Sequence, residues 1–274
     1  MKLIEVDLEK CVKCGMCREI CPRRVIEMNP QWPEAIHPEY CMNCGQCVAI
    51  CPTVALEHAT MPLSGQISLQ ELPVINRETA YQFLRSRRSI RSYKQEAIPR
   101  DLLLNLMDIA RFAPTASNSQ GVSYIVIEDK ETLQQISALT IDWMEERIQQ
   151  GHEGAKRFNG YVRSYRDTGT DVILREAPCL IIAVADQGFS NGRDNTHFSF
   201  AYTELYAPTL GLGSCYAGLV ELCALSGYPA LLRLLNLPES KTFTGAIMVG
   251  YPKYRYARLV DRNPLDIRFV SQKS

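Results

Sequence analysis

Two sets of four cysteines dominate the first 51 residues of the chain. Eight of the 11 cysteines belong to them, and a proline follows the last cysteine of each set. The second set repeats the spacing of the first 30 positions later: Cys11, Cys14, Cys17 and Cys21 precede Pro22, and Cys41, Cys44, Cys47 and Cys51 precede Pro52. Thiolate sulfur is a soft ligand that suits iron–sulfur clusters. The pattern therefore predicts metal-cluster sites and one-electron chemistry.

This doubled run resembles the bacterial two-cluster ferredoxins over about residues 1–58. In that family the fourth cysteine of each run ligates the other cluster. The resemblance implies that one [4Fe–4S] cluster takes Cys11, Cys14, Cys17 and Cys51, and that the other takes Cys41, Cys44, Cys47 and Cys21. Zinc is a weaker interpretation, because zinc sites favour two separated cysteine pairs. Disulfides are also weaker, because no signal peptide is visible.

A basic box and a small polar loop form the second chemical motif. The box places three guanidinium groups and a hydroxyl within five positions, at Arg87, Arg88, Ser89 and Arg91. Arginine forks match phosphate oxygens, and a serine hydroxyl can complete such a site. A short basic run alone also fits a solvated surface patch. The box is followed, however, by a predicted helix ending at Pro114 and a loop rich in hydrogen-bonding side chains, 115–120.

Together the box and the loop resemble the nitroreductase family, over residues 77–274. The resemblance implies an FMN-dependent reductase built as an intertwined homodimer. It implies that Arg87, Arg88 and Ser89 hold the FMN phosphate and ribityl oxygens, and that Arg91 faces the pyrimidine edge of the flavin. The residues expected at the flavin of the other subunit are Pro114, Thr115, Ala116, Asn118 and Gln120.

Two later segments fit the same family. The stretch 211–219 resembles the segment that lies against the isoalloxazine ring, which implies contacts from Tyr216, Ala217, Gly218 and Leu219. Its glycine spacing differs from the dinucleotide fingerprint, and a packed turn is the structural alternative. Near the C-terminus, basic residues follow a Gly-Tyr-Pro sequence, and Arg258 and Arg262 are favoured for the phosphate, with Arg255 in reserve. No catalytic side chain stands out, so hydride transfer is expected from FMN N5 itself.

The elements that must position these residues follow from the local patterns. Breakers between Ala59 and Pro73 predict a ferredoxin domain at 1–58, a linker at 59–75 and an FMN-binding nitroreductase-like domain at 76–274. The patterns predict helices at 77–85, 99–113, 196–210 and 230–235, and strands at 124–127, 180–184 and 246–249. Such an order predicts an α/β or α+β domain, and with the resemblances we expect an α+β fold with a mixed sheet flanked by helices. The long polar insert 141–175 is expected to cover the flavin, with Trp143 and Tyr161 as candidate pocket residues, although an aromatic residue at helical spacing is more often part of the core.

Composition and charge narrow the possible partners. A net charge of zero argues against a nucleic-acid partner held by bulk electrostatics. The longest strongly apolar stretch, 177–185, is far shorter than a membrane span. The cluster motif starts close to Met1, which leaves no room for a targeting segment, and such clusters need a reducing compartment. We therefore expect a cytoplasmic protein.

Three functions remain open from the sequence. In the favoured one, a redox protein charges the clusters, the clusters reduce FMN, and FMN reduces a small electrophile such as a nitro, quinone or enone compound. In the second, NAD(P)H reduces FMN directly and the clusters carry electrons outward. In the third, the chain is a non-catalytic electron-transfer module of a larger complex.

Overall fold

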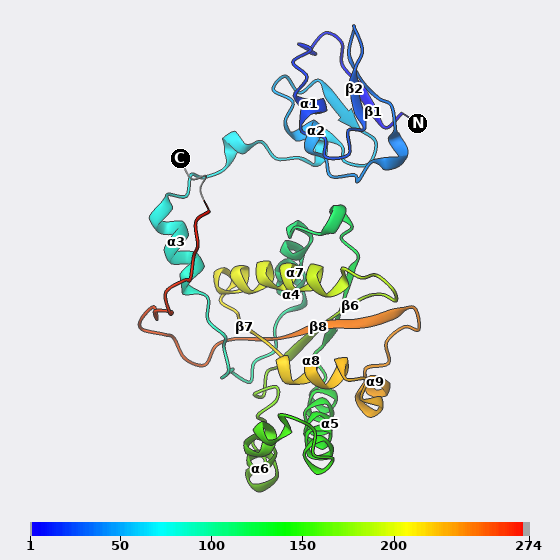
Figure 1. Cartoon of the computed structure of the whole chain (residues 1–274). Helices are drawn as coiled ribbons and strands as arrows, with labels where there is room; N and C mark the ends of the chain where they lie inside the picture. The colour runs from blue at the N-terminus through cyan, green and yellow to red at the C-terminus, as the bar shows by residue number, and fades with distance from the viewer. Residues whose placement is uncertain (1, 271–274) are drawn as a thin grey trace. The chain divides into compact units, whose positions relative to one another are not determined.

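The computed structural model describes residues 2–270, which divide into two compact units (Figure 1). The first unit comprises the residues up to Ile75 together with Pro114–Gly121. The second comprises Asn76–Ala113 and the residues from Val122 onward. The short segment Pro114–Gly121 thus makes its contacts with the cysteine-rich part of the chain, although both of its ends continue into the second unit.

The first unit is built from short elements around a small core. Its two-stranded antiparallel sheets pair β1 (Ile4–Val6) with β4 (Leu56–His58), and β2 (Ile26–Met28) with β3 (Pro33–Ala35). Between them lie helices α1 (Met16–Glu19) and α2 (Gln46–Ala49) and the 3-10 turns η1 (Pro38–Tyr40), η2 (Leu63–Gly65) and η3 (Leu69–Glu71). Its hydrophobic core cluster is small and consists of the buried residues Ile4, Cys17, Ile26, Val48 and Leu56. A core of this size gives little stability alone, which is why such domains depend on metal or other cross-links.

The repeat in the sequence reappears in the backbone of this unit. Three pairs of residues, each separated by 30 positions, have positive φ: Lys13 (56°) and Asn43 (51°), Gly15 (76°) and Gly45 (70°), and Arg24 (51°) and Val54 (55°). Positive φ is uncommon for residues other than glycine and is unusual for a β-branched residue such as Val54. The two halves therefore carry the same demanding loop geometry, and these loops contain the cysteines.

The second unit is centred on a four-stranded sheet with the order β5-β6-β8-β7. The strands are β5 (Val122–Ile127), β6 (Cys179–Asp186), β7 (Gly213–Tyr216) and β8 (Lys241–Gly250). All three strand pairings are antiparallel. Among the described residues, the only parallel pairing is the isolated bridge between Ser89 of the basic box and Ser214 of β7. The parallel component of the expected mixed sheet is therefore limited to this bridge.

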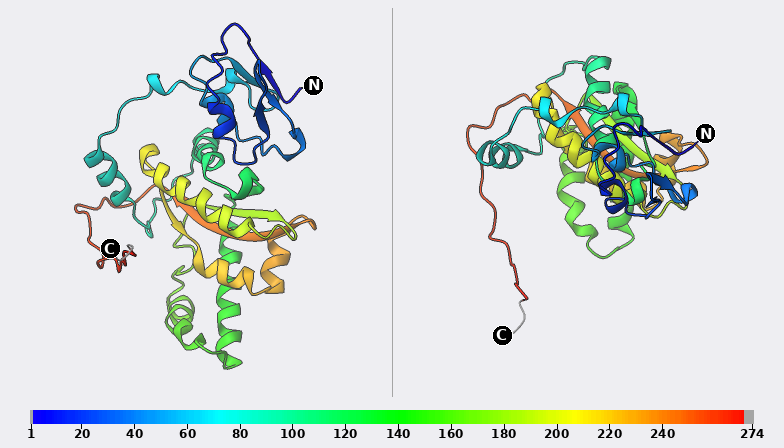
Figure 2. Two further views of the ribbon diagram at one scale, coloured as in Figure 1. Left: turned by 45° about the horizontal axis from the view of Figure 1, so that its top comes forward. Right: turned by 90° about the horizontal axis from the view of Figure 1, so that it is seen from above.

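Helices cover both faces of this sheet (Figures 1 and 2). The helices of this unit are α3 (Arg77–Ser86), α4 (Arg100–Asp108), α5 (Lys130–Gln149), α6 (Asn159–Thr168), α7 (Gly192–Tyr206), α8 (Gly218–Leu225) and α9 (Pro229–Leu235), with 3-10 turns η4 (Ile109–Phe112), η6 (Ala155–Phe158) and η7 (Ala207–Leu210). The 3-10 turn η5 (Ala116–Asn118) belongs to the first unit, and α3 buries none of its side chains. Within residues 2–270 no single helix is long and apolar enough to cross a membrane; α8 and α9 reach that length and composition only as a pair bent by 109°.

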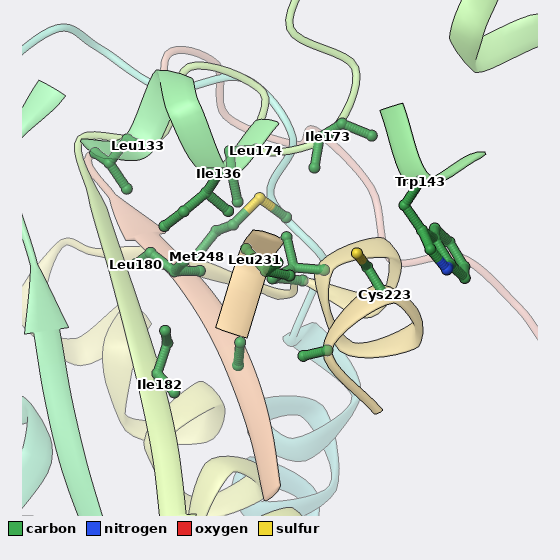
Figure 3. Packing of buried hydrophobic residues seen from close by; sticks show 14 of the residues in the cluster. Leu133, Ile136, Trp143, Ile173, Leu174, Leu180, Ile182, Cys223, Leu231 and Met248 are labelled. Carbon is green, nitrogen blue, oxygen red and sulfur yellow. The ribbon is translucent and has the colours of Figure 1, made fainter. Parts of the chain in front are cut away.

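The alternation of side chains along β6 explains how both faces are filled. Cys179, Ile181 and Ala183 lie in one core cluster, which includes residues of α4 and α7. Leu180, Ile182 and Val184 lie in the other, which includes residues of α5, α8 and α9. Because successive residues of a strand face opposite sides, a strand covered on both sides reads as a continuous apolar run. Figure 3 shows the second cluster, where Leu180, Ile182 and Met248 of the sheet lie close to helix residues such as Ile136 and Leu231.

The expected helices and strands are present, and two more helices occupy the region read as an insert. Asn76 caps α3, since its side chain accepts a hydrogen bond of 2.8 Å from the Thr79 amide. Residues 141–175 are not an irregular insert, because they contain the second half of α5 and all of α6. Trp143 is buried and its ring lies 5.4 Å from that of Phe158, so it is a core residue. Tyr161 packs partly buried against the same cluster.

Phe200 offers a test of the core. Its side chain is fully buried on α7, with its ring 5.9 Å from that of Tyr124 and 6.0 Å from that of Tyr216. Truncating a buried phenylalanine typically costs about 3–5 kcal/mol. We therefore expect Phe200→Ala to lower the free energy of unfolding in urea by that amount. Phe198→Ala is the matched control on the same helix, because Phe198 is 51% exposed and its loss should cost only about 0.5 kcal/mol.

Candidate functional site

Each predicted set of four cysteines surrounds one small cavity in the first unit. We call them the first and second cavities. The first is lined by Cys11, Cys14, Cys17 and Cys51, and the second by Cys21, Cys41, Cys44 and Cys47. The remaining lining is mostly apolar and includes Leu56 in the first cavity and Ile26 in the second. The fourth cysteine of each run thus lies in the cavity of the other run, which is the crossed arrangement that the resemblance implied.

The donor set of each cavity fits a cationic cluster. Burial raises the pKa of Cys17, and neighbouring Cys14 and Cys11 raise it further; burial likewise raises the pKa of Cys47 to about 11, with Cys44 and Cys41 adding to the shift. Buried thiolates this close repel one another unless iron neutralises them. Within residues 2–270, no group of three or more His, Cys, Asp and Glu side chains is arranged to hold a single metal ion.

Backbone amides point at the crossed cysteines in both halves. The amide of Val25 donates to the Cys21 sulfur at 3.3 Å, and the amide of Ala55 donates to the Cys51 sulfur at 3.2 Å. Val25 and Ala55 are equivalent positions of the repeat, 30 residues apart. Hydrogen bonds to cysteine sulfurs stabilise the charged ligand and tune the potential of a bound cluster.

The polar loop predicted at the flavin contacts the second cavity's own loop. The side-chain amide of Asn118 donates to the carbonyl oxygens of Met42 and Asn43, both at 3.0 Å. A guanidinium nitrogen of Arg23 lies 3.3 Å from the Ser117 hydroxyl and donates to it. Gln120 and Thr115 are joined by a 3.0 Å hydrogen bond from the Gln120 amide to the Thr115 hydroxyl. Pro114 and Ala116 belong to the same segment.

A cavity of about 320 Å³ in the second unit gathers part of the predicted phosphate site. Arg88 from the basic box meets Arg255 and Arg258 from the C-terminal segment along its wall, with Ser214 and Glu204 opposite. The Arg88 guanidinium also lies 5.2 Å above the ring of Tyr256. Three cations from distant parts of the chain, around one cavity, form a donor set that suits a phosphate group. Arg87, Ser89, Arg91 and Arg262 do not line this cavity.

Arg87 is paired with a carboxylate from helix α7. One of its guanidinium nitrogens lies 3.4 Å from a carboxylate oxygen of Glu204, which is also 3.4 Å from the Ser214 hydroxyl. Burial raises the pKa of Glu204, while Arg87 and Ser214 oppose that rise. Glu204 was not singled out from the sequence. The one sequence feature that could have indicated Glu204 is that this acidic residue lies between two apolar residues, Phe200 and Ala207, of a predicted helix, and both of these are buried.

The segment expected against the flavin ring begins as strand β7 and continues as helix α8. Tyr216 donates from its hydroxyl to the His197 carbonyl at 3.1 Å, and buried Ala217 donates its amide to the Ala246 carbonyl at 2.9 Å. Leu219 packs partly buried against the core. A Cβ atom added at Gly218 would have no neighbour within 4 Å, so the backbone there faces open space that a flat cofactor can approach.

Cys215, the remaining thiol near this segment, is a core residue. It is buried, and burial is the main cause that raises its pKa. The thiol is therefore protonated at neutral pH and is a poor nucleophile.

Two protein-family models match this chain. The model of the nitroreductase family matches residues 84–251, and that of the 4Fe-4S dicluster domain matches residues 10–55. The chain belongs to the nitroreductase family. The two matches confirm the predicted resemblances and the predicted fold class, and they agree with FMN and two [4Fe–4S] clusters as the cofactors of this nitroreductase-family protein.

Relatives of this nitroreductase-family chain include curated iodotyrosine deiodinases. The enzyme of Thermotoga neapolitana is 24% identical over 181 residues, which cover 65% of this chain and 92% of the relative. Iodotyrosine deiodinase 1 of Mus musculus is 27% identical over 177 residues, and the match spans 63% of this chain and 61% of the mouse protein.

Solved structures share the fold of the second unit. A nitroreductase with bound FMN from Desulfitobacterium hafniense superposes with a TM-score of 0.55 at 22% identity, over 69% of this chain and 96% of that one. An iodotyrosine deiodinase bound to FMN and 3-iodo-L-tyrosine gives 0.53 at 23% identity, over 70% and 98%.

Proposed function

We propose that this protein is a flavin-dependent reductase in which two [4Fe–4S] clusters deliver low-potential electrons to FMN, and the flavin reduces a small organic electrophile. The observation that carries the proposal is the contact of Asn118 with the carbonyls of Met42 and Asn43. Met42 and Asn43 lie between two cysteines of the second cavity, and the segment of Asn118 leads directly into β5 of the nitroreductase fold. The loop between Cys41 and Cys44 is thus bound by a segment that continues, in sequence, into the nitroreductase fold.

Arg88, Arg255 and Arg258 would hold the phosphate of FMN, and the open backbone at Gly218 would leave room for the ring. Bound FMN supplies a conversion between one-electron donors and hydride transfer. The other predicted contacts remain proposals, namely Arg87, Ser89, Arg91 and Arg262 on one side, and Tyr216, Ala217 and Leu219 on the other. The same is true of the Pro114–Gln120 loop at a flavin of the other subunit.

A homodimer fits the exposed apolar surface of the second unit. Helix α3 buries none of its side chains. The segment after β8 is tied to it, since Arg85 donates to the Val260 carbonyl at 3.3 Å. Large apolar side chains on these two pieces are exposed, namely Tyr81, Phe83, Leu84, Leu265, Ile267, Phe269 and Val270. Large exposed apolar side chains gathered on one helix and on an extended segment support an interaction site. A second copy of the chain is the proposed partner, in a reducing cytoplasm.

Among small electrophiles, an activated aromatic compound is favoured. The curated relatives are named for iodotyrosine, a halogenated phenol. At about a quarter identity this supports a class of reductive chemistry, with nitroaromatics and quinones in the same class.

Anaerobic reduction with separate donors tests the proposed route. We expect a reduced low-potential donor to bleach the flavin and to produce EPR signals of reduced clusters, whereas NADH and NADPH should reduce FMN slowly. The reason is that the clusters, and not the flavin, offer the entry for single electrons. Rapid reduction of FMN by NADH or NADPH would instead support outward flow through the clusters. Fast cluster and flavin reduction with no turnover of any aromatic electrophile would support an electron-transfer module.

A further inference from the structure

One buried histidine contacts the second cavity and has no equivalent at the first. His58 is 2% exposed at the end of β4 and lines the second cavity. Its Nε2 atom lies 3.5 Å from the sulfur of Cys41, which is within hydrogen-bond range for sulfur. The sequence gives His58 no role, because it stands outside both cysteine runs.

The other side of the ring fixes which nitrogen carries the proton. The backbone amides of Thr60 and Met61 both donate to Nδ1 of His58, each at 3.2 Å. An amide N–H can only donate, so Nδ1 must be the unprotonated acceptor of the neutral ring. The hydrogen of the ring is then on Nε2, and it points at the Cys41 sulfur. His58 is therefore a donor to that thiolate, held in place by two backbone groups.

The sequence repeat supplies an internal comparison. Position 58 corresponds to position 28 in the other half. The residue there is Met28, whose side chain has no N–H to donate. The second cavity gains one more donor, because the Asn43 amide lies 3.4 Å from the Cys41 sulfur. The first cavity has in return the Thr53 hydroxyl, at 3.9 Å from the Cys51 sulfur, and backbone hydrogen bonds from Thr53 and Val54 to Cys51.

The two cavities also share two features. Each has a backbone donor at the equivalent position of the repeat, Ala55 at Cys51 and Val25 at Cys21. Each also has one basic residue in its lining, Lys13 in the first and Arg23 in the second. The second cavity is distinguished by the donors around its first cysteine, Cys41, and among them by the one side-chain N–H, that of His58.

We propose that His58 sets the two clusters at different potentials and so gives the electron path a direction. The inference rests on the proposed function, since it assumes a cluster in each cavity. A donor at a ligand sulfur favours the reduced, more negative cluster, so the cluster of the second cavity has the higher reduction potential. One electron then leaves the reduced first cluster and reduces the second, and an external low-potential one-electron donor restores the first. The second cavity's loop, with Met42 and Asn43, is the one that Asn118 holds.

The test is a redox titration of the full chain, purified anaerobically, with each cluster followed by EPR. In the wild type we expect two couples of unequal potential. His58→Met, which matches position 28 in side-chain type, should lower the higher couple and leave the lower one in place. We expect the equilibrium constant for electron transfer from the first to the second cluster to fall about tenfold, which corresponds to about 59 mV for a one-electron couple.

Two further variants separate the hydrogen bond from packing. His58→Gln keeps a donor near the position of Nε2 and should restore most of the lost potential. Thr60→Val removes the hydroxyl that lies 3.2 Å from Nδ1 and donates to the Asn43 side-chain oxygen at 2.9 Å. It leaves both backbone donors to Nδ1 and should change neither couple. Equal couples in the wild type, a shift of the lower couple or of both couples in His58→Met, or equal effects of His58→Met and His58→Gln would each overturn the inference. Failure of the clusters to reduce FMN would overturn the proposed function alone, because these potentials are measured without flavin turnover.

Discussion

Cys44→Ser should remove the cluster of the second cavity and cut the flow of electrons from a low-potential donor to FMN by at least about a hundredfold. Cys44 lines the cavity whose loop is held by Asn118. Serine keeps the size of the side chain but replaces a soft thiolate by a hard oxygen, which binds iron weakly. The measurement is stopped-flow reduction of the flavin, with iron and FMN content determined on the same sample.

The flavin should remain bound in this variant, because Cys44 lies in a different unit from Arg88 and Arg258. Cys14→Ser is the matched control at the first cavity. It should reduce iron content to a similar degree, while a donor that can reach the second cluster directly should still reduce FMN. Wild-type rates of flavin reduction in Cys44→Ser would refute the proposed route.

Arg88→Ala should raise the dissociation constant of FMN by about 10- to 100-fold, since a hydrogen bond to a charged partner contributes about 1.5–3 kcal/mol. Arg88 is the member of the basic box that shares a cavity with Arg255 and Arg258. The flavin retained per chain after gel filtration gives a first reading, and fluorescence titration of the flavin-free protein gives the constant. Unchanged affinity would remove Arg88 from the phosphate site.

Arg87→Ala should lower the free energy of unfolding, and the size of this loss should depend on pH. Burial already raises the pKa of Glu204, and loss of the Arg87 guanidinium 3.4 Å away removes a charge that opposes this rise. A carboxyl whose pKa is higher in the folded state stabilises the fold below its unfolded pKa and loses that contribution as pH rises. We therefore expect the destabilisation in Arg87→Ala to grow from pH 5 to pH 8, reaching about 1–3 kcal/mol in urea unfolding. A pH-independent loss would show that Glu204 is not the partner that matters.

The parts of this protein that sequence could predict are those in which chemistry depends on local spacing. Cysteines such as Cys41 and Cys44 must bind the same metal cluster, so they lie at short, regular spacing in the sequence. The residues with positive φ recur at the same 30-residue interval as the cysteines. The start of α3 is equally local, because Asn76 directly precedes the helix and accepts a hydrogen bond from the Thr79 amide three residues later.

What the sequence did not reveal depends on partners that are distant in the chain. Glu204 meets Arg87 across 117 positions, and no pattern around either residue indicates the pair. Helix α5 was hidden because Ser137 and Thr140 occupy buried positions on it, which blurs its apolar stripe. An alignment of the two halves of the repeat could have indicated His58, because the aligned residue in the other half is Met28.

The crossed lining of the two cavities has a consequence for damage and repair. Each cavity borrows its fourth cysteine from the opposite run, Cys51 for the first and Cys21 for the second. An oxidant that dismantles one cluster therefore also frees a cysteine that anchors the opposite half of the domain. With so few buried side chains to hold it, that half cannot keep its shape by itself. Exposure to oxygen thus acts on the domain as one cooperative unit, and rebuilding either cluster requires both halves to close together.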